Sequence, residues 1–169
     1  MNLTAPPLPL FNPDARLSSV PLGGGQQCLV LDDALAEPER LVEWARTAAF
    51  AAPDGFPYPG RVVPAPYDLT SRLNDYFGQH LRSRLGGRRT LDAQARLSLV
   101  TTPPEALAPC QWLCHRDRIA EDPRKVLFAA SVLYLFRDPA LGGTSFYRPR
   151  RSPAETDQLV AASQLLTAA

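Results

Sequence analysis

Histidine and cysteine are both scarce in this chain of 169 residues, which contains only two histidines, His80 and His115, and three cysteines. Because most metal and acid–base sites in proteins use histidine, few positions in this chain can carry such chemistry. An odd and sparse set of cysteines is not typical of a disulfide scaffold, so we expect a cytoplasmic protein with reduced thiols.

The sequence also lacks an excess of charge of one sign and long hydrophobic segments. Its 18 Lys and Arg residues balance 17 Asp and Glu residues, and a net charge of +1 argues against a nucleic-acid or acidic-membrane partner. No apolar run approaches the roughly 20 residues that cross a bilayer. The N-terminal segment has no basic stretch followed by an apolar one, so no secretory signal and no membrane association are expected.

Proline, by contrast, is abundant, with 18 residues, about twice the usual frequency. This abundance limits long helices and favours a loop-rich fold that contains β-structure. A hydrophobic content of 45% is typical of a globular chain, and we expect a single domain over residues 1–169. Its expected parts are an extended arm (1–25), a strand with two helices (26–93), the core strands (94–151) and a C-terminal helix (152–169).

The first half predicts one strand and two helices. Residues 27–31 predict a short strand after the glycine turn at 23–25, and we expect Asp32-Asp33 to end it. Apolar residues at helical spacing predict a helix over 38–49, with Pro38 as its first residue. Leucines and a phenylalanine repeat every four residues over 69–85, which predicts a second helix.

The ends of the second predicted helix also carry signals. Gly86-Gly87 can end it in the left-handed conformation. His80 borders its apolar face, and we interpret it chiefly as a packing or hydrogen-bonded histidine.

From residue 94 the pattern becomes that of strands. We expect extended structure at 94–100 and 110–115. The apolar run 126–136 predicts either a central strand buried on both faces or two strands in sequence. Another strand is expected at 144–147. Ser152 and Glu155 have the spacing of a capping box, which predicts the start of the C-terminal helix.

The sharpest chemical feature is His115-x-Asp117. On a strand, residues i and i+2 lie on the same face, about 6.6 Å apart along the chain. An imidazole and a carboxylate in this arrangement supply two of the three ligands of the facial triad in non-haem Fe(II) oxygenases. By itself the tripeptide is a weak signal, because it also arises by chance and in surface turns.

The order of segments around this pair resembles the Fe(II)/2-oxoglutarate-dependent dioxygenases, and especially their prolyl-hydroxylase-like branch. In that branch a His-x-Asp strand precedes a Tyr-Leu strand and a Gly-Gly-hydrophobic strand. The wider pattern resembles a bacterial family of uncharacterised proteins of the DUF6445 type. The segments that carry this resemblance are Val30 to Asp33, Tyr58 to Arg61, Arg96 to Val100, His115-x-Asp117 and Gly142 to Arg148.

The resemblance implies an α+β, mainly β fold with a double-stranded β-helix (jelly-roll, cupin-like) core, complete or partial, and N-terminal helices packed on one sheet. It implies an oxygenase that uses Fe(II) and 2-oxoglutarate to hydroxylate an unknown small molecule or peptide. His115 and Asp117 would be the metal ligands. Tyr134 would bind the 2-oxoglutarate carboxylate, and the alternative for it is a core aromatic residue.

Arg148 belongs to a basic cluster with Arg150 and Arg151. This cluster is either an anion site, where Arg148 would contact the cofactor or a substrate carboxylate, or a solvated rim.

One departure from the dioxygenase pattern is that no histidine follows Asp117, whereas the family places a second histidine on a later strand. The alternative function is therefore a truncated or degenerate, non-catalytic β-helix module. An incomplete β-helix would have open strand edges, through which the chain could pair with a second copy as a homodimer.

Two further interpretations use the cysteines. Cys110, Cys114 and His115 could be soft ligands for zinc, although their spacing is not that of a usual zinc finger. A redox role for Cys110 and Cys114 has similarly weak support, because C-x₃-C lacks the placement at a helix start that lowers the pKa of a thiol.

Overall fold

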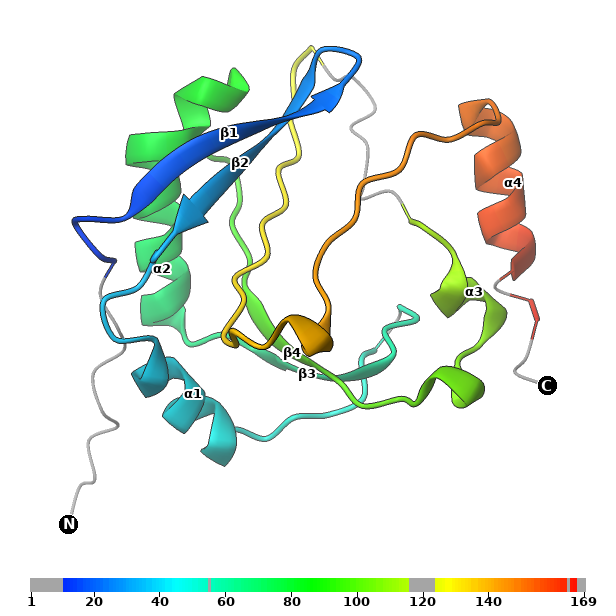
Figure 1. Ribbon diagram of the computed structural model, residues 1–169, viewed down its shortest axis with the longest axis horizontal. Coiled ribbons are helices and arrows are strands. Elements are labelled where there is room, and N and C mark those ends of the chain that lie inside the picture. The colour runs from blue at the N-terminus through cyan, green and yellow to red at the C-terminus, as the bar shows by residue number, and fades with distance from the viewer. Residues whose placement is uncertain (1–10, 55, 116–123, 164, 167–169) are drawn as a thin grey trace. The chain divides into compact units, whose positions relative to one another are not determined.

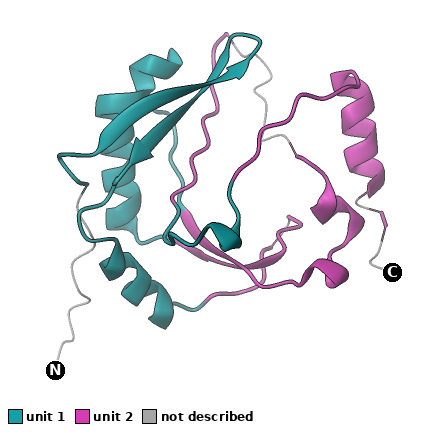
Figure 2. Cartoon of the chain, viewed as in Figure 1, with its two compact units in different colours: residues 1–49, 65–95, 134–143 teal, residues 50–64, 96–133, 144–169 magenta. Residues whose placement is uncertain are grey.

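The structure is a computed structural model that describes residues 11–54, 56–115, 124–163 and 165–166. The chain divides into two compact units (Figure 2). Unit 1 comprises residues 1–49, 65–95 and 134–143, and unit 2 comprises residues 50–64, 96–133 and 144–169. Over the described ranges the fold is mixed, with two small antiparallel sheets and four α-helices (Figure 1).

Unit 1 begins with an antiparallel hairpin of β1 (Arg16–Gly23) and β2 (Gln26–Asp32). Gly23, Gly24 and Gly25 all have positive φ, so the predicted turn is confirmed. The prediction that the whole of 1–25 is an arm is wrong, because residues 16–23 pair with β2. Prolines are tolerated here since β1 is an edge strand, and the pairing register shifts next to Pro21.

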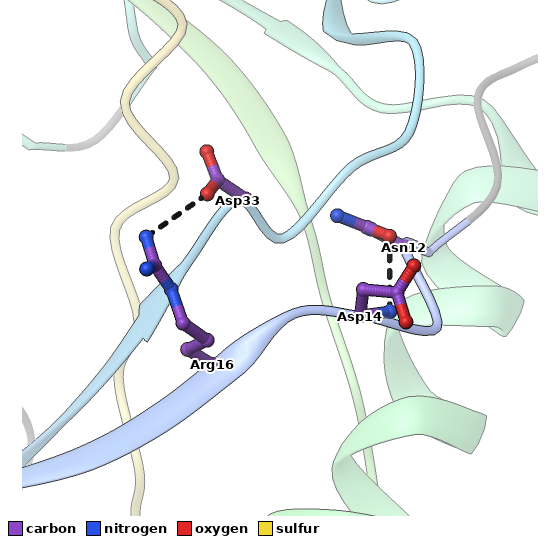
Figure 3. Close-up of polar contacts among 4 residues, drawn as sticks. All are labelled: Asn12, Asp14, Arg16 and Asp33. Atoms are coloured by element: carbon purple, nitrogen blue, oxygen red, sulfur yellow. Dashed lines mark hydrogen bonds and ion pairs between the residues drawn. The ribbon is translucent and has the colours of Figure 1, made fainter.

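Polar contacts fix the chain at the open end of this hairpin (Figure 3). The Arg16 guanidinium donates to the Asp33 carboxylate over 3.3 Å, just beyond the end of β2. Asp33 has a φ of 54°, and this left-handed residue ends the strand where the sequence predicted. Asn12 Oδ1 accepts a hydrogen bond from the Asp14 backbone N–H at 3.0 Å, which closes the turn that leads into β1.

Both predicted helices of the first half are present in unit 1. α1 (Pro38–Thr47) begins at its proline, as predicted. α2 (Tyr67–Tyr76) continues through a π-helical segment, η1 (Phe77–Leu81), and a 3₁₀ turn, η2 (Arg82–Leu85), which together span the second predicted helix. Gly86 follows with a φ of 81°, so the predicted left-handed end is confirmed. The buried hydrophobic residues among those described are Leu35, Leu41 and Leu69, and all belong to this unit.

Unit 2 contains the second sheet, in which β3 (Gly60–Pro64) pairs antiparallel with β4 (Arg96–Val100). β4 confirms the strand that was expected at 94–100. On the other side of β3, Val62 forms an isolated bridge with Ala51. The short 3₁₀ turn η3 (Pro104–Ala106) follows β4 in unit 2, and a similar turn in unit 1, η4, covers Pro139–Leu141.

Two helices of unit 2 contact each other, α3 (Pro109–Trp112) and α4 (Pro153–Ser163). The extended segment predicted at 110–115 is therefore wrong over its first three residues. Pro109 suits the first turn of a helix, and the Gln111 side chain accepts a hydrogen bond from the Ala108 backbone N–H at 2.8 Å, which stabilises this turn. The C-terminal helix is confirmed at the position that the sequence predicted.

The two later strands are not formed. Residues 126–136 and 144–147 have no assigned strand structure, and of the first run only Val126 and Leu135 are partly buried. An apolar run becomes a strand only when a neighbouring strand satisfies its backbone N–H and C=O groups, and neither run belongs to the two sheets of the described residues. The described residues contain no closed barrel, and their fold is a mixed α and β fold with two two-stranded sheets.

Candidate functional site

His115 lies in irregular chain of unit 2, three residues after the end of α3. The chain turns into an extended conformation at Leu113, with φ of −81° and ψ of 139°, so the helix does not continue to the histidine. Both Cys114 and His115 are exposed. We expect His115 and Asp117 to share one face of a strand, but His115 does not lie on a strand.

Asp117 lies outside the described residues, so its pairing with His115 stays a prediction. In the described part of the chain, no group of three or more His, Cys, Asp or Glu side chains is placed to hold a metal ion. The zinc interpretation is therefore wrong, because Cys110, Cys114 and His115 are all described and form no such group. Both cysteines are free thiols, as is Cys28.

Tyr134 lies in irregular chain of unit 1 and is 43% exposed. Its ring meets the ring of Phe136 edge to face, with centroids 5.5 Å apart and planes at 70°. Tyr134 therefore lies neither on a strand nor in the core. Its contact with 2-oxoglutarate stays a prediction.

The basic cluster of Arg148, Arg150 and Arg151 lies just before α4 in unit 2. All three residues are exposed and stand in irregular chain. Their exposure agrees with the solvated-rim interpretation, and a cofactor contact of Arg148 stays a prediction.

His80 packs against one aromatic ring in unit 1, that of Tyr76. Its ring centroid is 4.5 Å from that of Tyr76, and Tyr76 in turn stacks on Phe11 at 4.1 Å with an interplanar angle of 16°. The packing role that the sequence predicted for His80 is therefore confirmed, although the residue is exposed and outside the core.

The sequence interpretation missed a polar hollow in the same helical segment. Asn74, Gly78 and Arg82 line it together with Arg89 and Thr90 from the following loop. The first three residues are spaced by four, which places them on one face of a helix, and this polar stripe was the available signal. The apolar repeat lies one residue before these positions, about 100° around the helix, and by itself it predicts packing alone.

Comparison with known proteins places the chain in one family. Residues 13–169 match DUF6445, a family of unknown function, and the chain belongs to this family. The comparisons with curated proteins and with solved structures found no match to this chain. Among the described residues, no helix combines the length and the apolar character that crossing a membrane requires.

Proposed function

We propose that this chain is an Fe(II)/2-oxoglutarate-dependent oxygenase that hydroxylates an unknown small molecule or peptide. The observation that carries the proposal is the order of segments along the chain: His115-x-Asp117, then a Tyr-Leu segment at Tyr134, then Gly-Gly-Thr-x-Phe-Tyr-Arg ending at Arg148. In this proposal His115 and Asp117 bind Fe(II), and Tyr134 and Arg148 bind 2-oxoglutarate.

The double-stranded β-helix core belongs to the same proposal. The run 126–136 is apolar but largely exposed, with Leu127 55% and Val132 66% accessible. Exposed apolar patches of this kind mark surfaces that pair or pack with another partner. We propose that the run forms a strand when its edges are paired, and pairing with a second copy of the chain would supply such an edge.

Fe(II) would supply open coordination positions for 2-oxoglutarate and O₂. The described residues do not complete such a centre, because His115 is the only proposed metal ligand among them and no three-ligand group includes it. The residues present therefore define no catalytic step, and the proposal concerns the ligands and the class of reaction.

The test is the conversion of 2-oxoglutarate to succinate by the purified chain with Fe(II), ascorbate and O₂, without added substrate. We expect slow succinate formation that His115→Ala abolishes. His80→Ala is the matched control, because His80 is the only other histidine and packs on Tyr76. Equal turnover of the His115→Ala variant and the unchanged chain would refute the assignment of His115 as a ligand.

The second candidate function is a non-catalytic module of the same lineage. Two observations favour it: the described residues contain no three-ligand group, and the sequence has no histidine after Asp117. This alternative predicts no succinate from a folded protein whose circular dichroism spectrum retains its helical signal. Succinate formation that depends on His115 would exclude it.

A further inference from the structure

β4 in unit 2 has one paired edge and one open edge. Among the described residues its sheet contains only β3 and β4, and Val62 bridges to Ala51 on the far side of β3 (Figure 1). The other edge of β4 therefore has no strand beside it in this part of the chain. An open strand edge is a template for pairing with another chain.

The register of the sheet determines which backbone groups of β4 point to the open edge. The Thr101 N–H donates to the Pro59 carbonyl at 3.1 Å, and the Ala65 N–H donates to the Ala95 carbonyl at 3.0 Å. Because hydrogen-bonded and non-hydrogen-bonded pairs alternate in an antiparallel ladder, the odd-numbered residues of β4 direct their backbone groups to β3. The residues whose N–H and C=O groups point outward are Arg96, Ser98 and Val100.

These outward groups are available for a partner. In the described part of the chain, no backbone hydrogen bond joins them to another segment. The strand also exposes apolar surface, since Leu99 is 47% and Val100 69% accessible. The buried hydrophobic residues among those described all belong to unit 1, so unit 2 retains apolar surface that a partner could cover.

The sequence of β4, Arg-Leu-Ser-Leu-Val, is nearly a palindrome centred on Ser98. Two antiparallel copies aligned on this serine would place Ser98 opposite Ser98, and Arg96 of each copy opposite Val100 of the other. All three pairs would be hydrogen-bonded pairs, each exchanging two backbone hydrogen bonds. Any other register would leave at least one outward residue of each β4 strand without a partner in the other.

The side chains suit the same register. Leu97 of each copy would lie opposite Leu99 of the other in a non-hydrogen-bonded pair, where side chains approach most closely. Arg96 is the only charged residue of the strand, and it would lie opposite an apolar valine. No like charges would therefore oppose each other across the interface.

We propose that two copies of this chain pair antiparallel through β4, aligned on Ser98, and form a continuous four-stranded sheet. A second copy fits this edge because it supplies the complementary backbone groups and the leucine partners in one register. The pairing is independent of the proposed oxygenase activity and requires neither Fe(II) nor 2-oxoglutarate.

The first test is size-exclusion chromatography with light scattering over a range of protein concentrations, without metal or cofactor. We expect the mass to rise from 18.5 kDa toward twice that value at about 10–100 µM protein, as is typical of a small interface. A mass that stays at 18.5 kDa up to about 1 mM would overturn the proposal.

A charge exchange at Ser98 tests the register. Ser98→Lys and Ser98→Glu each place like charges opposite each other, so each variant should dimerise about fivefold more weakly or worse. An equimolar mixture of the two should recover the dimer, because opposite charges then meet. Ser18→Lys and Ser18→Glu are the matched controls, since Ser18 is an exposed serine of β1 in the other sheet. A mixture that stays monomeric, or equal effects at Ser18, would overturn the proposal.

Hydrogen exchange of the backbone amides distinguishes a second copy from a segment of the same chain. We expect the Leu97 and Leu99 amides to be protected at all concentrations, because they face β3. The Ser98 and Val100 amides should become protected only as the protein concentration rises. Protection of these two amides in dilute monomer would show that the chain covers its own edge, and it would overturn the proposal.

Discussion

Ser152 and Glu155 hold each other at the start of α4. The Ser152 hydroxyl donates to Glu155 Oε2 at 2.6 Å and accepts from the Glu155 backbone N–H at 3.3 Å. The Ser152 backbone N–H donates to the same carboxylate oxygen at 2.9 Å. This reciprocal pairing is the capping box that the sequence predicted, and it satisfies backbone groups that a helix start otherwise leaves without partners.

The first prediction concerns the pH dependence of this cap. The hydrogen bond from the Ser152 hydroxyl, and next that from its backbone N–H, hold the pKa of Glu155 below its ordinary value of 4.5. A lowered pKa in the folded state means that the cap stabilises the helix above pH 4.5 and is lost as pH falls through the lowered pKa. An NMR pH titration should show the Ser152 and Glu155 amides shifting below pH 4.5. In Glu155→Gln this shift should vanish, and a Glu155 midpoint at or above 4.5 would contradict the prediction.

The second prediction concerns the core of unit 1. Leu41 on α1 is 1% exposed. Leu41→Ala should lower the free energy of unfolding by about 2–5 kcal/mol, because it removes buried apolar contacts and leaves a cavity. Glu43→Ala, at an exposed position of the same helix, should change it by less than about 0.5 kcal/mol. Urea denaturation followed by circular dichroism measures both, and equal midpoints for the two variants would show that Leu41 is not a core residue.

The third prediction concerns the sheet of unit 2. A Cβ at Gly60 would overlap the backbone carbonyl oxygen of Leu99 in β4 and would lie 2.9 Å from the Thr101 backbone nitrogen. Because backbone atoms cannot rotate away, Gly60→Ala should separate β3 from β4 and cost about 1–3 kcal/mol of stability. Gly143→Ala is the control, since nothing lies within 4 Å of its Cβ position. Thermal unfolding of both variants tests this close approach, and an unchanged Tm of Gly60→Ala would count against it.

The elements that the sequence predicted well are those with local causes. Pro38 begins α1, Gly86 ends the second helical segment, and Ser152 with Glu155 begins α4, each through contacts within a few residues. The run 126–136 was expected as a strand from its composition alone. Strand formation depends on a partner elsewhere in the chain or in another chain, and the run itself contains no information about one.

The candidate site was predictable only as residue types and spacing. His115-x-Asp117 can be found in the sequence, but the geometry that would bring the two side chains to one face required a strand. Pro109 starts a short helix before them instead, and the Ala108–Gln111 hydrogen bond stabilises it. Asn74, Gly78 and Arg82 can be seen in the sequence at a spacing of four, but the hollow that they line with Arg89 and Thr90 is revealed only by the structure.

The most direct test of the proposed metal pair is an anaerobic titration of the chain with Fe(II) in the presence of 2-oxoglutarate, followed by visible absorption. If His115 and Asp117 bind Fe(II), we expect a weak charge-transfer band that saturates with Fe(II). This band should be absent in His115→Ala and in Asp117→Ala and should be retained in His80→Ala. No band in the unchanged chain, or a band that survives both ligand substitutions, would contradict the account.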